Sequence, residues 1–240
     1  MSLTVTKRTV RDVTIAAQGE EMRSLDMYYS YEDIDITVGT GLLFGPEGTP
    51  YAFCPLLFSV KIPKDYPFTP PQVLILTSDA VTRFHPNLYV GGKVCLSILG
   101  TYPGPKWSSM MNIGTVFKSI LSILDENPIT NEPGWEKFTL EDSKARDYAE
   151  WVEFNLLKLT VHQYRSFLLG TNHNWNTFKE VFESDGWKEK WSRIGEKLKA
   201  RLEKGDKVYL GIPYGMSGMT KWQILLKEFQ TTSEMLSSNL

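Results

Sequence analysis

The stretch that decides the fold of this chain reads Phe84-His85-Pro86-Asn87-Leu88-Tyr89-Val90-Gly91-Gly92-Lys93-Val94-Cys95-Leu96. It places Cys95 eight positions after Asn87, in a segment whose proline and glycines favour turns. A thiol is intrinsically nucleophilic toward carbonyl carbon, and an amide side chain can stabilise the oxyanion that forms beside it. Gly91 and Gly92 on one side and an irregular loop on the other predict an exposed thiol. The first chemistry that this stretch predicts is therefore acyl transfer through Cys95.

Two proline-rich segments precede this stretch. They read Gly45-Pro46-Glu47-Gly48-Thr49-Pro50-Tyr51 and Tyr66-Pro67-Phe68-Thr69-Pro70-Pro71. With His85-Pro86-Asn87 and the residues around Cys95, they resemble the ubiquitin-conjugating enzymes, which hold ubiquitin as a thioester on that cysteine. The resemblance covers about residues 4–148. The long segment 100–107 and Asn131-Glu132-Pro133-Gly134 are similar to large, atypical members of that family, since the common form has a shorter stretch between its Cys and Trp.

The resemblance implies an α+β domain of the UBC type, with an N-terminal helix, a four-stranded antiparallel meander, an irregular active-site loop and a central helix. The residues themselves predict a helix over 4–17 and short strands at 33–40, 55–62 and 73–77, separated by Gly and Pro clusters. Ser108 or Ser109 is expected to cap the central helix, which Asn127-Pro128 ends. Residues 80–107 have almost no periodicity, as is usual for functional loops.

The last part of the sequence predicts a helical extension. We expect a catalytic domain over residues 1–148 and the extension over 149–240, packed on or beside it. Helices are expected at 144–169, 187–202 and 220–229, and a glycine-rich loop at 205–218. The helix at 187–202 repeats Trp187, Trp191, Ile194, Leu198 and Leu202 at spacings of four and three.

The resemblance assigns the nucleophile to Cys95 and oxyanion stabilisation to Asn87. Taken alone, Asn87 could also cap a turn, because Asn does so often after Pro. His85 is a general base by residue type, whereas the resemblance gives it hydrogen bonds that hold the loop. The family desolvates and orients the attacking lysine, so no strong base is required.

Further residues match partner surfaces of the family. A possible ligase surface comprises Phe68, Trp107, Ser108, Ser109 and Met110, although Ser109 and Met110 stand where the common form has Pro-Ala. Lys7, Arg8 and Arg11 fall on one helical face and are similar to the basic patch that meets the activating enzyme; a solvated charged face is the alternative interpretation. Thr130 or Asn131 occupies the gate position where an Asp or Ser often orients the lysine. The implied partners are ubiquitin or a ubiquitin-like modifier, an activating enzyme, a ubiquitin ligase and protein substrates.

Composition sets limits on other functions. The chain has 240 residues, 42% of them hydrophobic, and its net charge of -2 argues neither for nor against a polyanion partner. We expect neither a nucleic-acid nor a membrane partner. No apolar run reaches the ~18 residues of a membrane span, so we expect a cytoplasmic or nuclear protein. Cys54 and Cys95 are too few for a disulfide framework, and Cys54 is expected to be buried. No metal-ligand spacing and no nucleotide-binding motif occur, so no cofactor is predicted; ATP would be used by the separate activating enzyme.

Two alternatives remain open from the sequence. One is a catalytically weak ubiquitin-binding or scaffold module of the same fold, which the intact Cys95 and Asn87 argue against. The other is a cysteine hydrolase that pairs Cys95 with His85 or His162.

Overall fold

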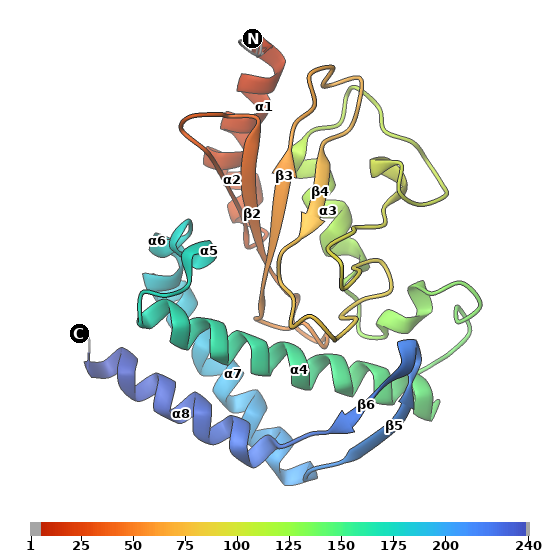
Figure 1. The fold of residues 1–240 in the computed structure, drawn as a ribbon, viewed down its shortest axis with the longest axis vertical. Helices are drawn as coiled ribbons and strands as arrows, with labels where there is room; N and C mark the ends of the chain where they lie inside the picture. Colours follow the sequence, from red (N-terminus) through yellow and green to blue (C-terminus); the bar gives the residue numbers. More distant parts are fainter. Residues whose placement is uncertain (1–5, 239–240) are drawn as a thin grey trace.

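The computed structural model describes residues 6–238, and its centre is a four-stranded antiparallel sheet (Figure 1). The strands are β1 (Met27–Tyr31), β2 (Val38–Phe44), β3 (Pro55–Lys61) and β4 (Gln72–Ile75), and they pair in chain order. The predicted meander is therefore confirmed. The strand expected at 33–40 is wrong in its first half, because Asp35 accepts hydrogen bonds from the backbone and hydroxyl of Thr37 and so forms a turn before β2. Strand β1 has no counterpart among the strands predicted from the residues.

Helix α3 (Ile113–Ile123) packs across one face of this sheet. Its buried residues Val116, Phe117 and Ile120 follow helical spacing. The ring of Phe117 occupies the place where a Cβ at Gly41 of β2 would lie, so only glycine allows this close approach. The cap is Asn112, not Ser108 or Ser109 as expected, and it forms a capping box with Thr115.

The N-terminal helix α1 (Lys7–Gln18) packs against β1 and α3, and the short α2 (Glu20–Arg23) follows it. The predicted start of this helix at residue 4 lies outside the described residues. Short 3₁₀ turns form at η1 (Ser97–Leu99), η2 (Pro128–Asn131) and η3 (Pro213–Gly215).

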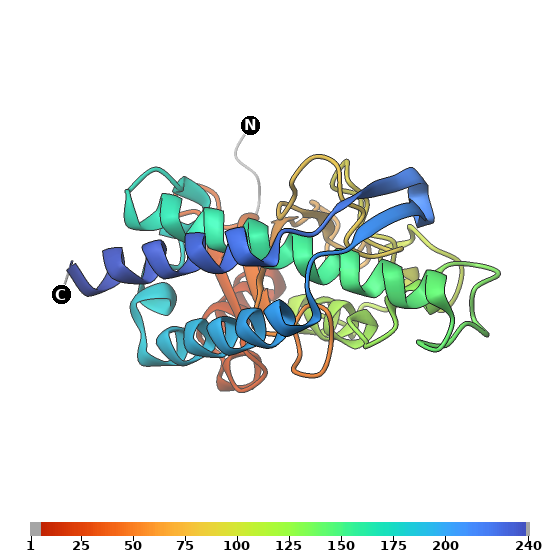
Figure 2. The same cartoon turned by 90° about the horizontal axis from the view of Figure 1, so that it is seen from below.

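The C-terminal extension contains helices α4 (Ser143–Leu168), α5 (His173–Asn176), α6 (Lys179–Glu183), α7 (Asp185–Lys204) and α8 (Trp222–Ser238). The long helix α4 lies between the sheet domain and α8, as the two views together show (Figures 1 and 2). The predicted domain boundary at 148 falls inside α4. The loop expected at 205–218 is instead a hairpin of β5 (Val208–Ile212) and β6 (Met216–Met219), because apolar strand residues flank a tight turn at 213–215.

Polar contacts connect α7 to the sheet domain. Lys190 lies 3.0 Å from the carboxylate of Asp26, and Arg193 pairs with Glu47. In the same helix, Lys197 and Arg201 both pair with Glu153 of α4, which is only 3% exposed. A buried carboxylate is costly unless it is paired, so these two cations allow α4 and α7 to pack around it.

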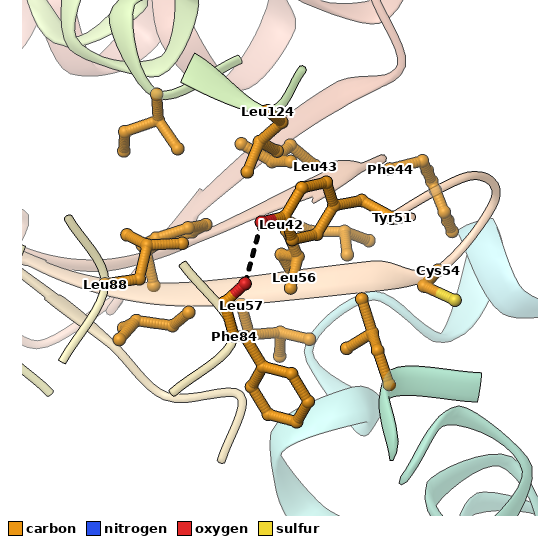
Figure 3. Close-up of a cluster of buried hydrophobic side chains, with 14 of the residues drawn as sticks. Leu42, Leu43, Phe44, Tyr51, Cys54, Leu56, Leu57, Phe84, Leu88 and Leu124 are labelled. Atoms are coloured by element: carbon orange, nitrogen blue, oxygen red, sulfur yellow. Dashed lines mark hydrogen bonds between the residues drawn. The ribbon is translucent and has the colours of Figure 1, made fainter. Parts of the chain in front are cut away.

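A hydrogen bond in the core fixes the entry into the irregular loop. Tyr51 is fully buried among the leucines of β2 and β3, and its hydroxyl donates to the carbonyl of Phe84 at 2.7 Å (Figure 3). Phe84 itself is buried in the same cluster. The first proline-rich segment of the sequence, which ends in Tyr51, thereby holds the chain immediately before His85.

The apolar stripe predicted on α7 is buried against both the extension and the sheet domain, since Trp187 lies 5.7 Å from Phe44 of β2 between ring centroids. Trp191 is 4% exposed, stacks on Phe229 of α8 at 4.4 Å between ring centroids, and donates from Nε1 to Ser233 Oγ at 2.9 Å. Leu202, at the end of the stripe, is 38% exposed.

We expect Trp191→Ala to lower the free energy of unfolding by about 3 to 5 kcal/mol, because it removes a buried aromatic side chain and leaves a cavity. Chemical denaturation followed by circular dichroism measures the change. Leu202→Ala on the same helix is the control and should cost well under that. An equal, small effect of both variants would show that the stripe is not part of the core.

Candidate active site

His85 lies in the interior at the start of the irregular loop. Its Nδ1 accepts a hydrogen bond from the backbone N–H of Asn87 at 2.9 Å, so its Nε2 carries the proton and donates to the carbonyl of Ile123 at 2.9 Å. Burial lowers the pKa of His85 to about 3, and its residual exposure is 0%. Near neutral pH the ring is therefore uncharged, and both nitrogens are occupied.

Asn87 and Cys95 are joined by two hydrogen bonds. The backbone N–H of Cys95 donates to the Asn87 carbonyl at 2.8 Å, and Asn87 Nδ2 donates to the Cys95 carbonyl at 2.7 Å. An amide nitrogen has two N–H groups, so the second is free to donate to a group bound near the cysteine. The side-chain oxygen of Asn87 is buried and has no hydrogen-bond partner within the described residues.

The backbone on both sides of Cys95 is also held. Thr101 Oγ1 donates to the Val94 carbonyl at 2.7 Å and accepts from the Leu96 N–H at 3.0 Å. Val94 and Leu96 are buried in the core, and Cys95 itself is 3% exposed. The expectation of an exposed Cys95 is therefore wrong. The neighbouring glycines do not bring this residue to the surface, because hydrogen bonds hold the loop backbone in the interior.

The predicted gate residues lie in η2. Thr130 Oγ1 donates to the Asn127 carbonyl at 2.9 Å, and Asn131 Nδ2 donates to Asp125 Oδ2 at 3.0 Å. Both are partly buried. Burial raises the pKa of Asp125, while the hydrogen bond from Asn131 opposes that shift. The gate side chains thus stabilise the turn after α3 and keep only part of their surface for other contacts.

The residues of the predicted ligase surface lie on two neighbouring loops. Trp107 Nε1 donates to the carbonyl of Pro67 at 2.7 Å, which brings the loop of Phe68 beside the loop of Met110. Phe68 is 81% exposed and Met110 is 87% exposed. Ser108 and Ser109 are exposed as well. Exposed apolar side chains of this size on adjacent loops are typical of a contact for another protein.

The basic residues of α1 differ in their surroundings. Arg8 Nε pairs with the buried Asp12 at 2.6 Å, and its Nη2 donates to the Met111 carbonyl at 2.9 Å. Tyr66 also donates to Asp12. Arg8 therefore links α1 to the segment before α3, whereas Lys7 and Arg11 are exposed.

Sequence reasoning missed the residues that support the loop from a distance. Thr101 lies in the long segment after Cys95, and Tyr148 of α4 donates from its hydroxyl to the carbonyl of Arg83 at 2.9 Å. Arg83 in turn donates to the carbonyls of His85 and Pro86. Tyr148 and Arg83 are 65 residues apart in the sequence, so no local pattern indicates that bond.

The remaining chemical features give no second site. Cys54 is fully buried, and burial raises the pKa of its thiol to about 11, as expected of a structural cysteine. Among residues 6–238, no cluster of three or more His, Cys, Asp or Glu side chains could hold a metal ion. In the same part of the chain, no helix combines the length and apolar character needed to cross a bilayer.

The chain is similar in sequence to known proteins. The family model described as ubiquitin-conjugating enzyme matches residues 9–153. Ubiquitin-conjugating enzyme E2 Z of Homo sapiens is 40% identical over 136 residues, which are 56% of this chain and 38% of that protein. Probable ubiquitin-conjugating enzyme protein 17 of Caenorhabditis elegans is 32% identical over 191 residues, which are 76% of this chain and 25% of that protein. These matches thus span less than half the length of either relative.

A solved structure is also similar. The E2 domain of a Toxoplasma gondii ubiquitin conjugating enzyme has 25% sequence identity and a TM-score of 0.46, covering 62% of this chain and 95% of that chain.

The low pKa of His85 predicts how stability depends on pH. In the unfolded chain a His titrates near ~6.5, so on acidification the unfolded state binds this proton well before the folded state does. The contribution of neutral His85 to the free energy of unfolding is complete above about pH 6.5. It is lost as the pH falls toward about 3, the pKa of His85 in the folded protein. We expect the free energy of unfolding to fall by up to ~1.4 kcal/mol per pH unit in the upper part of this window.

Denaturant unfolding at pH 7, 6 and 5 measures this slope. His85→Gln should have a shallower slope, whatever its absolute stability, because its side chain does not titrate. His173→Gln alters an exposed histidine and serves as the control for the loss of an imidazole. Identical slopes in all three proteins would contradict the assignment of a buried, neutral His85.

Proposed function

The chain belongs to the ubiquitin-conjugating enzyme family, and on that premise we propose that it accepts ubiquitin or a ubiquitin-like modifier from an activating enzyme as a thioester on Cys95. The modifier then passes to a substrate lysine or to a ligase. All the residues that this proposal assigns to the chemistry lie within the predicted catalytic domain, residues 1–148.

The proposed reaction consists of two acyl transfers. In the first, the Cys95 thiolate attacks the carbonyl carbon of the modifier's C-terminal thioester, and the thiolate of the activating enzyme leaves. In the second, a neutral lysine amine attacks the new thioester, the Cys95 thiolate leaves, and the amine loses a proton to solvent. No oxidant, metal or bound nucleotide is needed in either step, because the activating enzyme has already used ATP.

The reciprocal hydrogen bonds between Asn87 and Cys95 carry this proposal. They hold the Asn87 side chain against the backbone carbonyl of Cys95, and in this proposal the second N–H of the amide donates to the oxyanion. We assign His85 to holding the loop, since its two nitrogens bind Asn87 and Ile123. Thr130 or Asn131 would limit the space that the incoming lysine can occupy.

The same geometry weighs against a cysteine hydrolase. Such an enzyme needs a histidine that can take the thiol proton. His85 accepts a backbone N–H on Nδ1 and is hard to protonate, and His162 on α4 lies 3.0 Å from Glu228 of α8, in the extension. Neither histidine is arranged as the base of a Cys-His pair.

The partner surfaces follow from exposure and charge. We propose that a ligase contacts Phe68 and Met110, with Trp107 holding the two loops together and Ser108 and Ser109 at the edge. Lys7 and Arg11 would contact the activating enzyme, and Arg8 would fix the orientation of α1 beneath them. We propose a cytoplasmic or nuclear location, where a catalytic thiol stays reduced.

Replacement of the nucleophile tests the proposal directly. Cys95→Ser, incubated with activating enzyme, ATP and modifier, should accumulate an adduct that resists reducing agent, because an alkoxide is a worse leaving group than a thiolate. The wild-type adduct should dissolve in thiol. Gel electrophoresis with and without dithiothreitol measures both.

Cys54→Ser is the matched control, since Cys54 is buried away from the loop, and its adduct should behave like that of the wild type. A thiol-sensitive adduct that persists in Cys95→Ala would remove Cys95 from the mechanism.

Asn87→Ala separates the two acyl transfers. Loss of one oxyanion donor typically costs ~10² to 10³ in rate. We expect this variant to slow transfer to free lysine by that factor while it slows thioester formation far less, as measured in separate charging and single-turnover discharge assays. Equal slowing of both steps would indicate a collapsed loop instead of a lost oxyanion contact.

A further inference from the structure

The tip of the β5–β6 hairpin holds a tyrosine in a backbone conformation that tyrosine rarely adopts. Tyr214 has φ 66° and ψ 22°, in the left-handed region, and it is followed by Gly215 with φ 71°. A bulky residue is strained in this region, whereas Asn or Gly adopts it readily. The local backbone conformation therefore disfavours a tyrosine at this position. The contacts of its side chain have to compensate for that strain.

Those contacts reach two segments of the candidate active site. The hydroxyl of Tyr214 donates to Glu132 Oε2 at 2.7 Å, and Glu132 directly follows the gate residue Asn131. The ring of Tyr214 faces the guanidinium of Arg83 at 4.9 Å from the ring centroid and contacts Tyr148 at 5.8 Å. One side chain of the extension thus contacts the segment after the gate and the segment before His85.

Arg83 connects this tyrosine to the catalytic loop. Its guanidinium lies 3.3 Å from the ring centroid of Tyr89 and 4.9 Å from that of Tyr214. From that position it donates to the carbonyl of His85 at 3.1 Å and to the carbonyl of Pro86 at 2.5 Å. Pro86 immediately precedes Asn87. The two rings hold the guanidinium by cation–π contacts. Its hydrogen bonds in turn hold the carbonyls of His85 and Pro86 in place.

The backbone of the hairpin supports the same arrangement. Arg83 N–H donates to the sulfur of Met216 in β6 at 3.4 Å, and the Arg83 carbonyl accepts from Tyr148. The hairpin lies beside the loop in both views (Figures 1 and 2). Tyr214 remains 39% exposed, so its ring is only partly covered by these contacts.

We propose that Tyr214 is a positioning residue for the transfer step. Through Tyr214, the C-terminal extension fixes the position of the Asn87 loop relative to the gate segment. The inference rests on the proposed function, because it concerns attack on the Cys95 thioester. Tyr214 acts through Arg83 on the carbonyls before Asn87, and through Glu132 on the segment after Asn131. A misplacement of about 1 Å in such a site can cost up to ~10² in rate.

Two substitutions at one position test this role. Tyr214→Asn removes the ring and the phenol but fits the left-handed turn, so we expect an unchanged or raised melting temperature. Its single-turnover discharge to free lysine at saturating concentration should fall about tenfold, with charging of Cys95 at the wild-type rate. Tyr214→Phe keeps the ring over Arg83 and loses only the bond to Glu132, so its discharge should fall by a smaller factor, about threefold.

Tyr209→Phe is the matched control. Tyr209 lies in the same hairpin and also donates from its hydroxyl to a carboxylate, that of Glu150, at 2.9 Å, but Glu150 belongs to α4 and not to the loop or the gate segment. This variant should charge and discharge as the wild type does.

The outcomes separate the role of Tyr214 from the proposed function. Wild-type protein that charges and discharges, with Tyr214→Asn discharging equally fast, would overturn the inference alone. The inference also fails if charging and discharge slow equally, or if Tyr209→Phe slows discharge as much as Tyr214→Asn. A wild-type protein that forms no thioester on Cys95 with any modifier would overturn the proposed function and the inference with it.

Discussion

An irregular segment inside a protein has to find hydrogen-bond partners for its backbone without a helix or a sheet to supply them. Residues 84–88 and 94–96 are all buried, and none of them belongs to a helix or a paired strand of the main sheet. Side chains supply many of the bonds: Tyr51 to Phe84, Asn87 to Cys95, and Thr101 to Val94 and Leu96. Asn87 and Thr101 belong to the irregular segment itself, whereas Tyr51 lies 33 residues before Phe84, so the shape of the loop depends on its own side chains and on the fold around it.

The extension contributes to this support and is more than an addition to a finished domain. Tyr148 of α4 binds the Arg83 carbonyl, and α4 itself continues past the predicted boundary at 148 to Leu168. The helix is then fixed against α7 by the buried Glu153 with its two cations. Because removal of either cation would leave a buried carboxylate poorly paired, α7 cannot shift far from α4 without a large cost. The geometry of the loop and the packing of the extension are therefore linked through one helix.

The sequence predicted those parts of the fold that depend on local pattern. The helix expected at 144–169 and the strand expected at 55–62 lie within one residue of α4 and β3, since apolar periodicity and flanking turns define them. Ser108 failed as a helix cap because Asn112, closer to the apolar run, competes for the same role. The β5–β6 hairpin was missed because its two strands are short and contain Gly211 and Gly218, and glycine is unfavourable inside a strand. For the candidate site, the motif indicated Asn87 and Cys95, but the support from Tyr51 and Tyr148 depends on partners 33 and 65 residues away in the chain.

The arrangement also decides which sides of the loop remain open to other proteins. The extension lies at the end of the sheet that is remote from the β3–β4 turn, and its hairpin covers the flank of the loop at Arg83 and Glu132 (Figure 1). Phe68, in that turn, and Met110 stay almost fully exposed. A partner that binds there meets two apolar side chains on loops joined by the Trp107 to Pro67 bond, and it does not have to displace the extension. The contacts between the extension and the loop thus lie at the opposite end of the sheet from the turn that carries Phe68.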